Sequence, residues 1–259
     1  MHTDEPAWKF RGILKNWMLE YHSFLVKGMM KFPENSKGGG KMDRFIEDLL
    51  VLIHQKDKRF LIGVSGHGAA GKTTFTQKFA GRIGSDRVNV LNTDPYITDS
   101  AVRKNTMITY DWNGKEHTFK MTACHPAAHH IPSLERDMKM LKKGMDLYTL
   151  DTGWLPSELL SANKKVTIAE GMSVAFLDQS LFDLSIYFYT DGETEFLRRS
   201  GRDIKERGME LAYLKQSHDE RRVQYEIFMH AHSELFDVVV NTSGDGFVVE
   251  KNEGFDSED

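Results

Sequence analysis

The sequence contains almost no cysteine and no long apolar run. Only one of its 259 residues is a cysteine, Cys124, which excludes an internal disulfide and is typical of a reducing cytoplasm. No apolar stretch approaches the roughly 20 residues that a membrane-spanning helix needs. Near the N-terminus Asp4 and Glu5 precede Trp8, and no small-residue cleavage site follows a hydrophobic stretch, which is unlike a signal peptide. We therefore expect a soluble cytoplasmic protein.

The chain also lacks a strong excess of either charge. It has 34 Lys and Arg against 38 Asp and Glu, a formal net charge of -4, so it carries no electrostatic footprint for nucleic acid or an anionic membrane. Its share of hydrophobic residues, 40%, is ordinary for a globular protein. The expected partner is a small-molecule substrate, without nucleic acid or membrane, and the sequence leaves a homo-oligomer open.

Strand and helix signals alternate along most of the chain. Short apolar runs such as "RFLIGVSG", "KKVTIAEG" and "LSIYFYT" are typical of buried strands, and helical spacing follows several of them. An Asn-Gly pair within "ITYDWNGKEHTFKM" predicts a β-hairpin. The alternation predicts a three-layer α/β fold, in which helices cover both faces of a mostly parallel sheet.

We divide the chain into three parts. Residues 1–58 are expected to be a helical extension, because apolar residues recur at helical spacing over 8–29 and a glycine-rich connector then leads to a second helix at about 43–55. Residues 59–245 form the α/β domain. Residues 246–259 are expected to be a frayed acidic tail.

The glycine-rich segment "GVSGHGAAGKTTF" fits the phosphate-loop pattern G-x-x-x-x-G-K-[ST]. Glycines let backbone N–H groups approach a polyanion without a Cβ in the way, and the following helix N-terminus adds donors and a partial positive charge. Lys72 can bridge the β- and γ-phosphates, and the Thr73 hydroxyl is suited to Mg²⁺. The predicted nucleotide cradle consists of Gly66, His67, Gly68, Ala69, Ala70, Gly71, Lys72, Thr73 and Thr74.

Two classes of nucleotide-binding protein fit this cradle. A guanine-nucleotide switch reads its base through Asn-Lys-x-Asp, and the nearest candidate, "NKKV", lacks the Asp. A phosphotransferase needs a carboxylate for the acceptor hydroxyl, an acidic magnesium partner and mobile arginines over the transferred group. Asp94 after the second strand and Glu170 at the end of "VTIAE" are candidates for the carboxylates. The candidate arginines are Arg198, Arg199, Arg202 and Arg207.

Each of these residues also has a purely structural interpretation. Asp94 precedes a proline, so it could cap a helix, and both roles can hold together. Glu170 could be a turn carboxylate, and the arginines a solvated helix face. His125, His129 and His130 have spacing that can bind metal, but no further ligands complete a zinc site. His129 or His130 could instead face the acceptor.

Five segments, in order between about residues 60 and 242, resemble the uridine kinase and phosphoribulokinase group of P-loop kinases. They are "LIGVSGHGAAGKTT", "NTDPY", "HPAAHHIPSLERDMKMLKKG", "VTIAEGMSVAF" and "FLRRSGRDIKERG". The resemblance implies a P-loop kinase fold and transfer of the γ-phosphoryl group of ATP, with Mg²⁺, to a hydroxyl of a small metabolite. By family, that metabolite is a pyrimidine ribonucleoside.

The resemblance also implies roles for individual residues. Asp94 would be the general base, Lys72, Arg202 and Arg207 would stabilise the phosphates, and Thr73 with Glu170 would serve Mg²⁺. Tyr148 would stack near the nucleoside base and Arg199 would lie at the acceptor site. The full set expected to contact the acceptor is Asp94, Tyr96, His125, Tyr148 and Arg199.

Departures from the family pattern fall on the acceptor side. Cys124 stands where a D-H-P motif supplies a carboxylate to ribose hydroxyls, Gly153 where a histidine contacts uracil, and Met209 where an arginine faces the nucleoside. A site loses discrimination when the polar partner of a substrate hydroxyl is missing. The alternatives are therefore a non-nucleoside acceptor, such as a sugar acid or phosphosugar, and a nucleotide-binding regulator without a transfer reaction.

Overall fold

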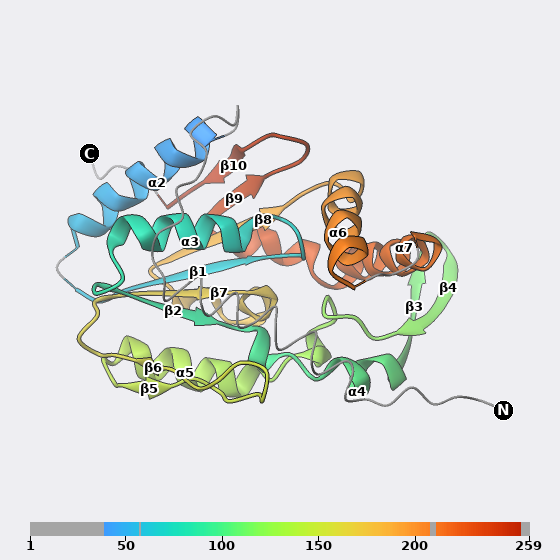
Figure 1. Cartoon of the computed structure of the whole chain (residues 1–259), viewed down its shortest axis with the longest axis horizontal. Coiled ribbons are helices and arrows are strands. Elements are labelled where there is room, and N and C mark those ends of the chain that lie inside the picture. The colour runs from blue at the N-terminus through green and yellow to red at the C-terminus, as the bar shows by residue number, and fades with distance from the viewer. Residues whose placement is uncertain (1–38, 57, 208–210, 255–259) are drawn as a thin grey trace.

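A six-stranded sheet in the order β10-β9-β8-β1-β7-β2 forms the centre of the computed structural model, which describes residues 39–56, 58–207 and 211–254 (Figure 1). Five neighbouring strands are parallel, and β10 is antiparallel to β9. The strands are β1 (Phe60–Gly66), β2 (Val88–Asn92), β7 (Val166–Glu170), β8 (Leu184–Tyr189), β9 (Val238–Asn241) and β10 (Val248–Asn252). Every residue of β1 and β7 is buried, as expected for strands covered on both faces.

Helices lie on both sides of this sheet. In Figure 1, α2 (Gly39–His54) and α3 (Lys72–Ile83) are on one side, and α5 (Ile131–Lys142) is on the other, beside the strand pair β5 (Leu147–Tyr148) and β6 (Leu159–Leu160). One apolar cluster, which includes Phe45, Phe75 and Phe188, joins α2 and α3 to the sheet. A second cluster, with Leu134 and Tyr187, joins α5 to the opposite face. The predicted three-layer α/β fold is confirmed.

A lobe at one end of the sheet consists of α6 (Gly192–Arg207), α7 (Leu211–Phe228) and the hairpin of β3 (Met107–Trp112) and β4 (Lys115–Lys120) (Figure 1). Asn113 and Gly114 form the hairpin turn with φ of 51° and 73°, the conformation that an Asn-Gly pair favours. Buried Gln224 of α7 donates to the Lys120 carbonyl oxygen at 3.0 Å and accepts from the Thr122 N–H at 2.9 Å. The hairpin prediction is confirmed, and Gln224 fixes the hairpin to α7.

Some segments differ from the sequence expectation. Residues 248–252, assigned to a frayed tail, form β10, in which Val249 packs against the core while Val248 is exposed. Because only every second side chain contacts the core, the strand lacks a continuous apolar run. The segment between β7 and β8 contains two 3₁₀-helices, η3 (Met172–Phe176) and η4 (Gln179–Leu181), and α4 (Ser100–Asn105) was not anticipated.

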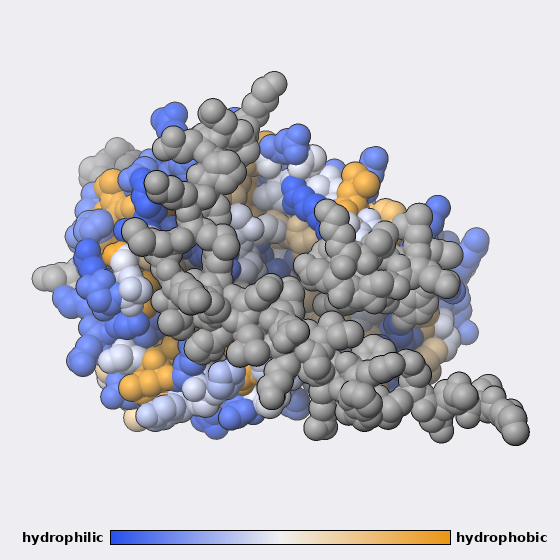
Figure 2. Space-filling model, viewed as in Figure 1, coloured by the Kyte–Doolittle hydropathy of each residue, from blue (hydrophilic) through white to orange (hydrophobic). Residues whose placement is uncertain are grey.

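The N-terminal part is described only from α2 onward. The helix expected over 8–29 lies outside the described residues, and α2 begins about four residues before the helix expected at 43–55. None of the helices in the described ranges is long and apolar enough to cross a bilayer. Figure 2 shows hydrophilic side chains over much of the visible described surface, with apolar side chains in separate small groups.

Candidate active site

The phosphate loop, Glu170 and Asp94 lie at one edge of the central sheet. β7 lies between β1 and β2, and its last residue, Glu170, is in register with Val64 of β1 and Asn92 of β2. The loop follows β1 directly, and Asp94 comes two residues after the end of β2. Open parallel sheets bind ligands beyond the carboxyl ends of their strands. The topology therefore gathers the predicted donor and acceptor residues at a ligand-binding edge.

Two glycines are required by the shape of the loop. Gly66 has a φ of 133°, and a Cβ at this position would lie 1.8 Å from the carbonyl oxygen of Phe188. Gly71 caps the N-terminus of α3 with a φ of 91°, a left-handed conformation that glycine adopts without strain. Ala69 between them also has a positive φ, 66°, which is strained for a residue with a Cβ. The loop thus turns sharply before α3 begins at Lys72.

Lys72 and Thr73 start α3 inside this turn. The Lys72 side chain is buried, and its ammonium donates to the carbonyl oxygen of His67 at 3.0 Å. The Thr73 hydroxyl donates to the Glu170 carboxylate at 3.3 Å. Thr74, the next residue of the cradle, is exposed. The loop after β1 and the Glu170 side chain at the end of β7 therefore meet at the first turn of α3.

Glu170 is a buried carboxylate whose pKa is raised to about 7. Burial is the main cause, and the nearby negative charge of Asp94 adds to it, while Lys72 and the hydrogen bond from Thr73 oppose it. The positive charge of Lys72 therefore compensates the negative charge of the Glu170 carboxylate only in part. A divalent cation at this position would complete the compensation.

Thr73 and Glu170 fit a Mg²⁺ site of the kind that holds a metal jointly with phosphates. Both supply oxygen, the ligand that Mg²⁺ prefers, and Mg²⁺ usually takes one or two protein ligands together with waters and substrate phosphates. Across the described ranges, no group of three or more His, Cys, Asp or Glu is arranged to hold a metal by itself. The prediction that Thr73 and Glu170 serve Mg²⁺ stays a proposal.

Asp94 is the first residue of a short 3₁₀-helix, η1 (Asp94–Tyr96), whose N-cap is Thr93. The capping interpretation of Asp94 is therefore wrong by one position. The Asp94 backbone N–H donates to the Asn92 side chain at 2.9 Å, and its own side chain is exposed at the sheet edge. An exposed carboxylate close enough to Glu170 to raise its pKa suits a base that meets an acceptor from solution.

Arg198, counted in the sequence only among the candidate arginines over the transferred group, joins the phosphate loop to the segment after β9. Its guanidinium donates to the Ala69 carbonyl oxygen at 3.2 Å and to the carbonyl oxygens of Thr242 and Gly244 at 2.7 Å each. The Thr242 hydroxyl in turn donates to the Ala70 carbonyl oxygen at 3.0 Å. These contacts hold the strained Ala69 turn. Sequence spacing could not reveal them, because they join residues more than forty positions apart.

The predicted acceptor residues are placed in different surroundings. Tyr96 is fully buried, and its hydroxyl donates to Asp137 of α5 at 2.5 Å, so in this structure it packs in the core and does not face an acceptor. His125 caps η2 (Pro126–Ala128), where its Nδ1 accepts from the Ala127 N–H at 3.1 Å. Tyr148 in β5 is 70% exposed. The structure thus gives Tyr96 a packing role and leaves Tyr148 open to solvent.

Cys124 and His129 lie buried behind the sheet edge. Burial raises the pKa of the Cys124 thiol to about 11, while the positive charges of Arg221 and Arg199 oppose that shift. Burial lowers the pKa of His129 to about 4, and its ring bridges the Ser173 hydroxyl at 2.8 Å and the Ala123 carbonyl oxygen at 2.9 Å. His129 is therefore a neutral tie between loops, and the nearly inaccessible Cys124 is a neutral thiol.

The segment that carries the candidate arginines, from Arg198 to Arg207, is described only in part. A Cβ on Gly68 would lie 2.7 Å from Nη1 of Arg199, so the Arg199 guanidinium lies against the phosphate loop. Arg202 and Arg207 belong to α6, but their side chains, like Met209, lie outside the described part. Gly153, aligned with a base-reading histidine, has a φ of 64°. The roles predicted for Arg202 and Arg207 stay proposals.

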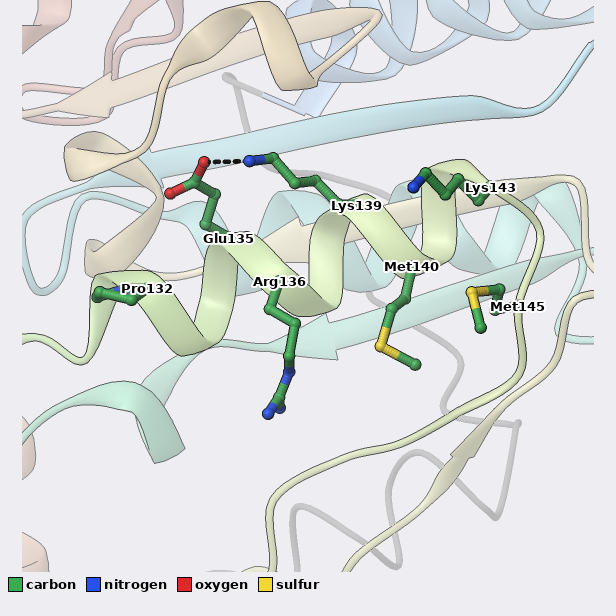
Figure 3. Close-up of a pocket in the computed structure, with 7 residues that line it drawn as sticks. All are labelled: Pro132, Glu135, Arg136, Lys139, Met140, Lys143 and Met145. Carbon is green, nitrogen blue, oxygen red and sulfur yellow. Dashed lines mark hydrogen bonds and ion pairs between the residues drawn. The ribbon is translucent and has the colours of Figure 1, made fainter.

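A separate surface pocket of about 360 Å³ lies along α5. Figure 3 shows Glu135 and Lys139 joined by an ion pair on this helix, with Met140 and Met145 nearby. None of its lining residues belongs to the phosphate loop, Glu170 or Asp94. The pocket is therefore distinct from the site at the sheet edge.

Sequence comparison assigns this site to a family. The sequence model of the Phosphoribulokinase / Uridine kinase family matches residues 61–248, which include every residue of the strand-end site. The chain belongs to this family. The resemblance stated from the motifs is thereby confirmed.

Individual relatives differ in their acceptors. A uridine kinase of Lactobacillus helveticus is 28% identical over 209 residues, which cover 76% of this chain and 93% of the relative. The chloroplastic phosphoribulokinase of Arabidopsis thaliana is 27% identical over 219 residues, 79% of this chain but 54% of the relative, so the chain spans about half the length of that protein. These similarities leave the acceptor of this chain open.

Among solved structures, the D-glycerate 3-kinase of Cryptococcus neoformans is similar to this chain with a TM-score of 0.52. The match covers 82% of this chain and 100% of that structure at 10% sequence identity. At this identity the likeness supports the fold alone.

Proposed function

We propose that this chain is a Mg·ATP-dependent kinase that transfers the γ-phosphoryl group to a hydroxyl of a small metabolite. The first candidate for this acceptor is the 5′-hydroxyl of a pyrimidine ribonucleoside. The observation that carries the proposal is the meeting of three parts at one sheet edge. They are the phosphate loop with Lys72, the Thr73–Glu170 pair, and the exposed carboxylate of Asp94. Family membership supports the reaction type, and the uridine kinase relative supports the nucleoside.

In this mechanism the chain's own residues bind the triphosphate and move one proton. Backbone N–H groups of the loop and the N-terminus of α3 hold the phosphates, and Lys72 exchanges its bond to the His67 carbonyl oxygen for phosphate oxygens. Mg²⁺, bound through Thr73 and Glu170, would neutralise phosphate charge. The oxygen of the acceptor hydroxyl attacks the γ-phosphorus while Asp94 accepts the hydroxyl proton, and the bond from the γ-phosphorus to the bridging oxygen breaks, so that ADP leaves. Arg202 and Arg207 would stabilise the transferred group.

A non-nucleoside acceptor carrying its own negative charge is the second candidate. The Cys124 thiol is neutral where the family motif has a carboxylate, and the charges of Arg221, Glu195 and Arg199 all act on it. The missing carboxylate removes one repulsion toward a negatively charged acceptor, such as a sugar acid or a phosphosugar, and this supports the second candidate.

An acceptor screen tests both candidates. ADP formation is followed by a coupled assay with Mg·ATP and one acceptor at a time: uridine, cytidine, sugar acids and phosphosugars. The first candidate predicts turnover with uridine or cytidine, and turnover with anionic sugars alone would replace it by the second. If no acceptor raises ADP formation above the acceptor-free rate, the kinase proposal fails in favour of a nucleotide-binding regulator.

A further inference from the structure

Behind the phosphate loop lies a buried carboxylate that the site described above does not use. Glu195 in the first turn of α6 is 1% exposed. Its carboxylate lies 3.4 Å from Nδ1 of His67, 3.3 Å from Nη1 of Arg199 and 3.5 Å from Nη1 of Arg222. A buried carboxylate is costly unless it is paired, so this arrangement of three nitrogen partners needs explanation.

Positive charges surround Glu195. Burial by itself would raise its pKa, but His67 and His218 when protonated, together with the guanidinium groups of Arg199 and Arg221, hold the pKa below its usual range. Arg222 is engaged elsewhere as well: its guanidinium donates to the Thr190 carbonyl oxygen at 3.0 Å and pairs with Glu226 at 2.7 Å. Among the described residues, Glu195 is the only ion-pair partner of Arg199, so we call Glu195 its tether.

His67 is the member of this cluster that belongs to the phosphate loop. His67 Nε2 lies 3.0 Å from the Thr190 N–H and 3.2 Å from the Thr190 carbonyl oxygen, and we assign the ring proton to Nδ1 because both groups that Nδ1 faces are acceptors. Nδ1 faces the Gly68 carbonyl oxygen at 2.9 Å and the Glu195 carboxylate at 3.4 Å. Burial lowers the pKa of His67 to about 4, which keeps the ring neutral at pH 7. The imidazole is therefore a fixed link between the loop, the end of β8 and Glu195.

The tether sets where Arg199 points. Glu195 and Arg199 are four residues apart on α6, so they share a face of the helix. The Arg199 guanidinium lies against Gly68, and its charge also acts on Cys124. Arg199 is thus placed between the loop that would hold the donor phosphates and the side on which the acceptor would bind.

We propose that Glu195 is a positioning residue of the transfer reaction: its carboxylate holds the Arg199 guanidinium over Gly68 and orients His67 of the phosphate loop. The inference rests on the proposed kinase function, because it assumes that Arg199 lies near the phosphoryl group that is transferred. Glu195 is 1% exposed, so we expect it to touch neither nucleotide nor acceptor. Its effect on turnover passes through Arg199.

A double-mutant cycle tests this dependence. Glu195→Gln keeps the size of the side chain and removes its charge, Arg199→Gln removes the tethered group, and the third variant carries both. Glu193→Gln is the matched control, because Glu193 lies in the same turn of α6 and is exposed. Turnover is measured with the acceptor found in the screen, ATP affinity by calorimetry, and stability by thermal unfolding.

We expect Glu195→Gln to lower kcat about 10- to 100-fold, as misplacement of a group at the reacting centre does, while ATP affinity stays within about threefold. In the Arg199→Gln background the same change should alter kcat by less than about threefold, because the two residues act as a unit. Glu195→Asp, which keeps the charge, should recover part of the lost turnover. Glu193→Gln should match the wild type.

Three results would overturn the inference while leaving the kinase function standing. One is wild-type kcat in a folded Glu195→Gln variant. Another is an equal loss of kcat with and without Arg199. The third is a loss of ATP affinity and melting temperature that accounts for the whole fall in turnover, which would make Glu195 merely structural.

A readout without turnover separates the two proposals. The ¹⁵N resonance of the Arg199 guanidinium, assigned from its loss in Arg199→Gln, should shift in Glu195→Gln and stay in place in Glu193→Gln. If the wild type transfers no phosphoryl group to any acceptor, the kinase function fails, and this resonance still decides whether Glu195 holds Arg199. An unshifted resonance in Glu195→Gln would remove the tether itself.

Discussion

The donor and acceptor sides of the candidate site differ in how firmly their side chains are held. On the donor side Lys72, Glu170, His67 and Glu195 are all buried and bonded to one another or to the loop backbone. On the acceptor side Asp94 is exposed and Tyr148 is 70% exposed. The difference indicates that the residues proposed to bind a triphosphate belong to the packed core of the fold. Asp94 and Tyr148 can change without disturbing that core, whereas Cys124 and Tyr96, also expected on the acceptor side, are buried.

The largest expected effect is the loss of turnover when the carboxylate of Asp94 is removed, because this residue is proposed to act on the acceptor while the phosphate loop still binds the donor. Asp94→Asn removes the proposed base from an exposed position, so we expect turnover to fall about 10²- to 10⁴-fold with ATP affinity little changed. Steady-state kinetics and calorimetry on the same preparation measure the two quantities. Asp219→Asn, at an exposed aspartate of α7, is the control. Turnover that survives in Asp94→Asn would assign the proton to another group.

A second expected effect concerns the burial of Glu170 on the donor side. Its pKa in the folded protein is raised to about 7, above its ordinary value, so its contribution to stability is fully present at low pH and is lost as the pH rises through about 7. The loss amounts to about 3 kcal/mol if a shift of this size is fully expressed. Glu170→Gln should therefore become more stable relative to the wild type between about pH 4.5 and 7 in the absence of Mg²⁺.

Denaturant unfolding of both proteins across this pH range makes the comparison, and it cancels the contributions of His67 and His129, which both proteins share. A difference between the two proteins that stays constant with pH would show that Glu170 is not buried as described.

The fold and the residues of the candidate donor site were largely predictable from sequence. The physical reason is that these residues are either consecutive in the chain or lie at the ends of neighbouring parallel strands. The phosphate loop, Lys72 and Thr73 are consecutive, and Glu170 and Asp94 come together because the carboxyl ends of neighbouring parallel strands meet. The links of Glu195 to His67 and of Arg198 to Thr242 join distant segments, so no sequence spacing reveals them. The burial of Tyr96 was missed for the same reason, because its partner Asp137 lies on α5.

A smaller expected effect is a change in acceptor preference when Cys124 is replaced. Cys124→Asp supplies a carboxylate at the position where the family motif has one. Burial and the negative charge of Glu195 oppose its ionised form there, while the positive charges of Arg221 and Arg199 support it. We expect kcat/KM for uridine to rise relative to that for an anionic sugar by about 10-fold or more. Cys124→Ser, which adds no charge, should leave this ratio within about threefold. An unchanged ratio in Cys124→Asp would separate Cys124 from acceptor choice.

Calorimetric titration of Mg·ATP into the wild type and Lys72→Met tests the central claim most directly. The claim is that the loop from Gly66 to Thr74 holds a triphosphate. We expect saturable binding to the wild type and a loss of at least about tenfold in affinity when the buried ammonium of Lys72 is removed. Wild-type protein that releases no heat, or a Lys72→Met variant that binds Mg·ATP as tightly as the wild type, would contradict the account.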